Sequence, residues 1–269
     1  MNTTSAVPLG RRSIAAIGLM SLIGLLAFGW PLLVQQGAEL SQGPDGPWLF
    51  ALLIPLLLAA VLAEISEGGM DAKSVALLGV LTAVAAALRP LSGGVTGFQP
   101  MFVVLVLAGR VFGPGFGFVL GATSMITSAL ITGGVGPWLP FQVLAAAWLG
   151  MGAGLLPRAR GRREVTLLAG YGALSSLGYG LLLNLWFWPF IATTGQISFV
   201  AGAPISENLG RLLAFTVATS LGFDIPRAIG TGVLLLLLGR PALHALRRAH
   251  RRAAFGVPHH ARPADPVRV

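Results

Sequence analysis

Long apolar runs fill most of this chain, and their lengths decide what it can fold into. Runs of about 17 to 25 apolar residues match the hydrocarbon thickness of a bilayer when they are helical. They can be placed at 13–35, 47–65, 71–89, 114–132, 138–156 and 164–190. With only 10% charged residues, the chain also has too few charges to cover a soluble globule of 269 residues. The sequence therefore predicts an all-α membrane protein.

Two further apolar segments are less regular. The run 100–111 is short for a full span, although it can cross the bilayer if it packs obliquely. The run 207–238 is too long for one upright helix and contains several glycines, so we expect a kink or break near Pro226. The expected architecture has eight crossings, divided into two helices and an acidic linker at 1–67, a six-helix core at 68–241 and a basic, disordered tail at 242–269.

The positions of the basic residues predict the orientation, because cytoplasmic loops carry an excess of Lys and Arg. If the amino terminus is cytoplasmic, eight crossings place most basic residues of the loops and the tail inside. Arg89 is the clear exception on the outer side, with Arg211 and Arg227 inside the last long segment. We expect a multi-pass plasma-membrane protein with both termini in the cytoplasm. This topology explains the net charge of +9 without nucleic-acid binding.

Composition also limits the chemistry. The chain has no cysteine, and its four histidines all follow the last apolar run. Disulfides and metal or iron–sulfur sites in the membrane are therefore not expected, and we predict no cofactor and no metal. The chain lacks a GxxxxGK[ST] phosphate loop and has Lys73 as its only lysine, so it cannot hydrolyse ATP itself. We predict no catalytic residue and no enzymatic activity.

The most acidic stretch lies at 64–71 and contains Glu64, Glu67 and Asp71. Carboxylates at this spacing can hold magnesium for chemistry on phosphates, but such a site needs a second acidic cluster facing the first. The loops predicted on the cytoplasmic side contain no second acidic cluster. We interpret the stretch as a solvated linker in which Asp71 caps the next helix.

Small residues recur at four-residue spacing on the helix expected at 71–89. Gly79, Ala83 and Ala87 lie on one face of it. In a bilayer, small residues let a second helix approach closely, since packing rather than hydrophobicity drives association there. The spacing alone does not distinguish a helix contact within the protein from the docking of a partner protein.

Polar and aromatic residues gather near the turns expected on the outer side. The glycine-rich turn 133–138 carries no charge and lies at membrane depth, so its backbone is expected to line a cavity. Amides within apolar runs either pair between helices or face a cavity. Tryptophans can line a binding site, but they are also typical of the interfacial belt of a membrane protein. Ionisable residues at three-residue spacing can form ion pairs within one helix. Ionisable residues inside a membrane nevertheless remain functional candidates. The candidate substrate-binding residues are Arg89, Phe98, Gln99, Trp138, Phe141, Gln142, Asn184, Trp188, Arg211, Asp224 and Arg227.

Three stretches of the chain resemble a known family. They are the small-residue helix with Ala83 and Ala87, the run from 108 to 142 with GRVFGPGFG and GGVGPWLPFQ, and DIPRAIG at 224–230. From about residue 71 onward the chain resembles the substrate-binding S component of an energy-coupling factor (ECF) vitamin transporter. The GPWLPFQ stretch is most similar to cobalamin-type S components.

The resemblance implies a six-helix membrane subunit that captures a vitamin and docks on a T component driven by two cytoplasmic ATPase subunits. It implies that the ligand lies near the outer face under residues 90–99, 133–138 and 191–206. It also implies that the helix with Gly79, Ala83 and Ala87 contacts the T component. The first two spans are an addition to this core, and we expect them to be dispensable for ligand binding.

Two other functions stay open. A self-sufficient secondary transporter usually has corresponding broken helices in two repeated halves, and only one interrupted segment is present here. A membrane enzyme acting on lipid or isoprenoid phosphates has the acidic stretch 64–71 as its only support.

Overall fold

The computed structural model of the chain describes residues 10–35, 50, 53–67, 72–92, 97–191 and 193–254. All regular structure in these ranges is helical, which confirms the prediction of an all-α membrane protein. The α-helices are α1 (Arg11–Leu33), α3 (Leu53–Glu67), α4 (Ala72–Leu88), α5 (Met101–Phe112), α6 (Pro114–Thr132), α7 (Leu139–Leu155), α8 (Gly161–Phe187), α9 (Ile205–Thr219) and α10 (Leu221–Ala254). Short 3-10 turns lie at Pro90–Ser92, Trp188–Phe190 and Gly195–Ile197.

Helix length and composition separate the described helices into two groups. Four stretches are long and apolar enough to cross a membrane, namely Arg11–Leu33, Pro114–Thr132, Gly161–Phe190 and Leu221–Arg251. The helices α4, α5 and α7 are apolar but shorter. The expected eight crossings therefore stay a prediction.

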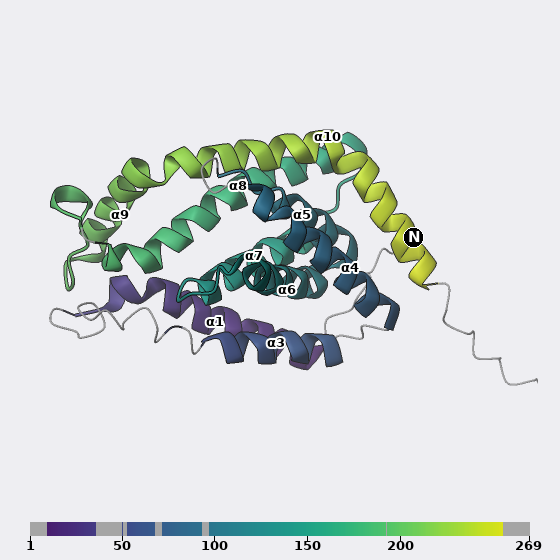
Figure 1. Cartoon of the computed structure of the whole chain (residues 1–269), viewed down its shortest axis with the longest axis horizontal. Coiled ribbons are helices and arrows are strands. Elements are labelled where there is room, and N and C mark those ends of the chain that lie inside the picture. The colour runs from purple at the N-terminus through teal and green to yellow at the C-terminus, as the bar shows by residue number, and fades with distance from the viewer. Residues whose placement is uncertain are drawn as a thin grey trace, which may run out of the picture.

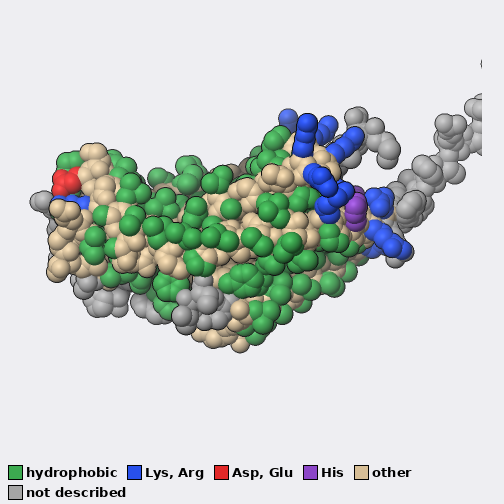
Figure 2. Space-filling view, turned by 90° about the horizontal axis from the view of Figure 1, so that it is seen from above, with side chains coloured by type: hydrophobic (Ala, Val, Ile, Leu, Met, Phe, Trp, Pro, Cys, Tyr) green, Lys and Arg blue, Asp and Glu red, His purple; other side chains and the backbone are tan. Residues whose placement is uncertain are grey.

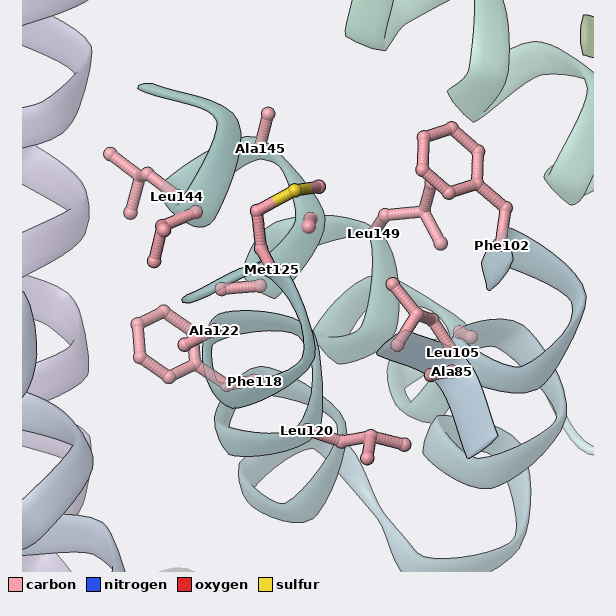
Figure 3. Close-up of a cluster of buried hydrophobic side chains, with 14 of the residues drawn as sticks. Ala85, Phe102, Leu105, Phe118, Leu120, Ala122, Met125, Leu144, Ala145 and Leu149 are labelled. Atoms are coloured by element: carbon pink, nitrogen blue, oxygen red, sulfur yellow. The ribbon is translucent and has the colours of Figure 1, made fainter. Parts of the chain in front are cut away.

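The helices are arranged in layers. The long helices α8 and α10 lie side by side along one side of the molecule, and α1 and α3 lie along the opposite side (Figure 1). Helices α5, α6 and α7 fill the space between them, with α4 packed against α5 and α6. Buried apolar side chains from four helices meet in this middle layer, among them Ala85, Phe102, Met125 and Leu149 (Figure 3).

Helices α6 and α7 approach each other more closely than side chains would allow. A Cβ atom added at Gly150 would lie 2.2 Å from the backbone oxygen of Gly117, and one at Gly121 would lie 2.2 Å from that of Ala146. Only glycine fits at these crossing points. In a bilayer, where packing drives helix association, such close backbone contact is a main source of stability.

The last long apolar segment breaks at a different place from the predicted one. The helix break lies at Ser220 rather than at Pro226, because α9 ends at Thr219, α10 begins at Leu221 and Pro226 lies inside α10. A kink at Pro226 stays a prediction. Pro226 removes only the hydrogen bond to the carbonyl of Gly222, at the very start of that helix. The break at Ser220 is stabilised instead by a side-chain partner, since its hydroxyl bonds with Asn184.

The carboxyl-terminal segment also differs from expectation. The prediction of a disordered tail from residue 242 is wrong for residues 242–254, which continue α10. This part of the helix is held because Leu243 is buried and Arg247 forms an ion pair with Glu164 of α8. Residues 255–269, with His259 and His260, and residues 68–71 of the acidic linker lie outside the described ranges.

Candidate functional site

The two ends of the molecule differ in chemistry. One end, called here the aromatic end, contains Trp30, Phe141, Trp186 and Trp188. The opposite end, called the arginine end, contains Arg110, Arg162, Arg163, Arg240 and Arg247, and Figure 2 shows basic side chains gathered there. Most candidate binding residues from the sequence lie near helix ends or in connections, but Arg211 lies in the middle of α9, and Arg227 contacts Ser176 in the middle of α8.

Arg89 connects three helices at the aromatic end. It follows α4, and its guanidinium donates to Oε1 of Gln142 in α7 at 2.8 Å and to Oγ of buried Ser128 in α6 at 3.3 Å. Charge-assisted hydrogen bonds of this kind are stronger than neutral ones. The structure thus brings together two predicted residues, Arg89 and Gln142, and adds Ser128, which the sequence analysis missed.

A buried ion pair lies at the start of α10. Asp224 and Arg227 form the salt bridge that their spacing predicted, and both side chains are buried. The Arg227 guanidinium also donates from Nε and Nη2 to the carbonyl oxygen of Ser176 at 3.2 and 3.0 Å. Its carbon lies 5.2 Å from the ring centroid of Tyr179, within cation–π range. The charge of Arg227 is therefore already compensated inside the protein.

Tyr179 in α8 lies beside the buried ion pair. Its ring faces Arg227 and meets that of Phe102 edge-on at 5.0 Å. We call Arg89, Ser128 and Gln142 the polar cluster. The sequence analysis missed Tyr179, although its spacing of three residues from Ser176 places two polar residues on one face of an apolar helix.

The segment before α5 contributes Phe98 and Gln99. Gly97 has a φ of 68° and passes so close to α10 that a Cβ atom would lie 2.1 Å from the carbonyl oxygen of Phe223. Phe98 then packs against Gly230 of the same helix. The Oε1 atom of Gln99 is buried and accepts no hydrogen bond from the described residues. An unsatisfied buried acceptor costs about 1 to 3 kcal/mol, so Gln99 offers an acceptor that a ligand could satisfy.

The predicted aromatic residues differ in access. Phe141 is stacked on Trp186 with ring centroids 4.3 Å apart, and Trp188 is buried with its Nε1 donating to the Ile197 carbonyl at 2.7 Å. Trp138 is 41% exposed, and its Nε1 donates to the Gly134 carbonyl at 3.2 Å. Of the three predicted aromatics Trp138, Phe141 and Trp188, Trp138 is the one that a ligand can reach in this conformation.

Asn184 and Arg211 have other partners. The Asn184 amide donates to Thr216 at 3.2 Å and to Ser220 at 2.8 Å, so it stabilises the break between α9 and α10. Arg211 forms a surface ion pair of 2.7 Å with Glu207. These contacts explain both residues as parts of the scaffold.

Comparison with known proteins decides the family. Residues 73–239, more than half of the chain, match the family model described as ECF transporter, substrate-specific component. The chain belongs to this family. No curated protein and no solved structure matches it. It is therefore a substrate-binding membrane subunit of an ECF transporter, which works with a T component and ATPase modules and is a transport component rather than an enzyme.

One face of α4 in this S component is open. Gly79, Ala83 and Ala87 are all exposed, and a Cβ atom added at Gly79 would meet nothing within 4 Å. The opposite face of α4 is buried against the core, where Thr82 shares a hydrogen bond of 2.9 Å with Thr123 of α6. The small-residue stripe predicted from the sequence thus lies on the surface of the described structure rather than in an internal helix contact.

The arginine end of the S component is held by a buried carboxylate that the sequence analysis missed. Glu164 of α8 pairs with Arg110 of α5 at 2.8 Å and with Arg247 of α10 at 2.6 Å. Arg110 also donates to the carbonyl oxygen of Leu156 after α7 at 2.9 Å. The available signal was a single acidic residue directly after a run of arginines. In the described ranges, no group of three His, Cys, Asp or Glu side chains could hold a metal ion.

Proposed function

We propose that this S component captures a vitamin at its aromatic end and that this end faces the outside of the cell. The orientation is supported by the arginines at the opposite end, because basic residues accumulate on the cytoplasmic side. Both termini are then cytoplasmic in the plasma membrane. In this proposal residues 68–241 form the substrate-binding core, and the ligand lies near residues 90–99, 133–138 and 191–206.

The polar cluster is the observation that carries the proposal. It joins the Arg89 guanidinium to the side-chain oxygens of Gln142 and Ser128. Gln99, just before α5, adds a buried acceptor that no described residue satisfies. Binding sites for cofactor-like molecules combine a large apolar area with a few polar groups that fix orientation. Phe98, which is partly exposed, and exposed Trp138 provide the apolar part.

The charges of the site favour a bulky and weakly charged ligand. Arg227 is compensated by Asp224 and Arg211 by Glu207, so two of the three predicted cations are engaged in ion pairs. A strongly anionic ligand would require several further cations. A corrinoid fits this description, and the GPWLPFQ stretch makes cobalamin the first ligand to test.

Delivery of the ligand requires a partner. We propose that the open face of α4, with Gly79, Ala83 and Ala87, docks on the T component of an ECF transporter whose ATPase subunits drive release. Small exposed residues allow a partner helix to approach closely in the bilayer. This docking would couple a subunit that cannot hydrolyse ATP to an energy source.

Uptake of radiolabelled cobalamin tests the proposal. Cells that express the S component with a T component and ATPases should accumulate cobalamin, and cells that lack the ATPases should only bind it. Uptake by the S component alone would indicate a secondary transporter. If calorimetry shows that the protein binds another vitamin but not cobalamin, the proposed ligand is wrong and the proposed vitamin-capturing function stands.

A further inference from the structure

Helices α1 and α3 precede the residues that match the family, yet α1 is built into the core. The face of α1 that packs against α7 and α8 is buried at Ile17, Met20, Gly24 and Phe28. This spacing of three and four residues is that of one helical face. Trp148 of α7 donates to the Ser21 hydroxyl at 2.9 Å, which fixes the two helices in register.

Trp30, near the end of α1, reaches the segment that connects α8 with α9. This segment is described over residues 188–191 and 193–204 and is called here the α8–α9 connection. The Nε1 atom of Trp30 donates to the carbonyl oxygen of Trp186 at 3.2 Å. Its ring stacks on Phe190 with centroids 5.2 Å apart and lies 6.4 Å from Phe199. One buried side chain of α1 therefore contacts Phe190, near the start of the connection, and Phe199, nine positions beyond it.

The same end of α1 also contacts the first turn of α7. Phe28 meets Phe141 edge-on with centroids 4.9 Å apart, and Phe141 in turn stacks on Trp186. Phe141 directly precedes Gln142 of the polar cluster. The aromatic residues of α1 thus touch both structural elements that flank the candidate site.

Among the described residues, the hydrogen bonds of the α8–α9 connection are local. Trp188 donates to the Ile197 carbonyl, and the Asn208 amide donates to the Val200 carbonyl at 2.8 Å. These bonds fold the connection on itself and onto α9. Trp30 differs because its ring contacts with Phe190 and Phe199 tie the connection to a helix more than 150 positions earlier in the chain.

We propose that Trp30 is a positioning residue for ligand binding, through which α1 holds the α8–α9 connection in place and slows ligand release. The inference rests on the proposed function, in which the ligand lies next to this connection. It predicts that the two amino-terminal helices contribute to binding, the opposite of their expected dispensability. Trp30 itself contacts no ligand in this scheme.

A spin label on the connection tests the positioning step without any ligand. Because the chain has no cysteine, Val200→Cys gives one labelling site on a partly exposed residue of the connection. Trp30→Ala should add a mobile component to the spectrum, and Trp30→Phe, which keeps the ring and loses the donor, should add less. The matched control is Met20→Ala, which removes a buried side chain from the same face of α1 farther from the connection. An unchanged spectrum for Trp30→Ala, or equal mobility in the control, would overturn the inference.

Release of cobalamin tests the consequence for binding. Measured by competition in nanodiscs, Trp30→Ala should release cobalamin about tenfold faster with little change in the association rate, as is usual for contacts that hold a complex closed. Met20→Ala should release it like the parent protein. Equal release rates for Trp30→Ala and parent would contradict the inference. If the parent does not bind cobalamin, the proposed ligand fails, and the label mobility alone decides the role of Trp30.

Discussion

The aromatic end and the arginine end join their helices by different interactions. At the aromatic end, stacked and edge-on rings such as Phe141 and Trp186 are combined with single N–H bonds from tryptophans to carbonyl oxygens. At the arginine end, one buried carboxylate, Glu164, accepts hydrogen bonds from arginines of two other helices. Aromatic pairs contribute about 0.5 to 1.5 kcal/mol each and can shift gradually.

The difference indicates which end is suited to change shape. Removing one partner from a buried ion pair is strongly destabilising, because the remaining charge is left without compensation. The arginine end is therefore suited to be a fixed base. The ring contacts and single N–H bonds of the aromatic end can be lost one at a time at smaller cost, which a site that must admit and release a ligand requires.

The largest expected effect is that of Glu164→Gln at the arginine end. It removes two ion pairs and leaves Arg110, whose side chain is 9% exposed, without its carboxylate. We expect a loss of about 3 to 5 kcal/mol in the free energy of unfolding, measured by denaturant titration in micelles. The control is Glu207→Gln, which breaks the exposed pair with Arg211 and should cost about 0 to 1 kcal/mol. Equal losses would remove the distinction between the two ends.

Next are Trp138→Ala and Gln142→Ala at the aromatic end. Each should weaken ligand binding by about 1 to 3 kcal/mol, since one removes an aromatic contact and the other leaves Arg89 with one acceptor fewer. Calorimetry with cobalamin measures this, and Leu174→Ala on the exposed surface of α8 is the control. If both variants bind cobalamin and other vitamins as the parent does, residues 133–142 are scaffold.

A third prediction concerns α4, which belongs to neither end. Ala83→Trp or Ala87→Trp should reduce co-purification with the T component severalfold and leave ligand binding nearly unchanged, because a bulky side chain blocks close approach of a helix. Ile229→Trp on the exposed surface of α10 should co-purify normally. Unchanged co-purification of both α4 variants would place the docking surface elsewhere.

The smallest expected effect is that of Thr82→Val between the two ends. It removes the hydroxyl pair between Thr82 and Thr123 but keeps the shape of the side chain. Hydrogen bonds between membrane helices contribute about 0.6 kcal/mol on average, so the unfolding free energy should fall by about that amount. A loss as large as that of Glu164→Gln would show that stability is not concentrated at the arginine end.

The sequence was informative where the decisive interaction is local. Helix α6 spans the predicted 114–132 because Pro114 is suited to be its first residue and Gly133, in the left-handed region, ends it. The pair of Asp224 and Arg227 was predictable because both residues lie on one helix, three positions apart.

Where partners are distant in the chain, the sequence was insufficient. Gln142 and Arg89 are 53 positions apart, and nothing in either segment indicates their contact. Asn184 was expected at the ligand, but its partners are Thr216 of α9 and Ser220 at the break before α10. The contact with Asn184 also lies at the helix break, at Ser220. Local helix breakers such as proline had instead favoured a break at Pro226.

The close crossing of α6 and α7 has a mechanical consequence. With backbone against backbone at Gly117 and Gly150, neither helix can roll about its own axis without steric overlap. The two helices must therefore move as one rigid body. Helices α6 and α7 and the turn 133–138 that joins them then form a stiff helical hairpin. Any motion that admits a ligand has to occur in the elements around this hairpin rather than within it.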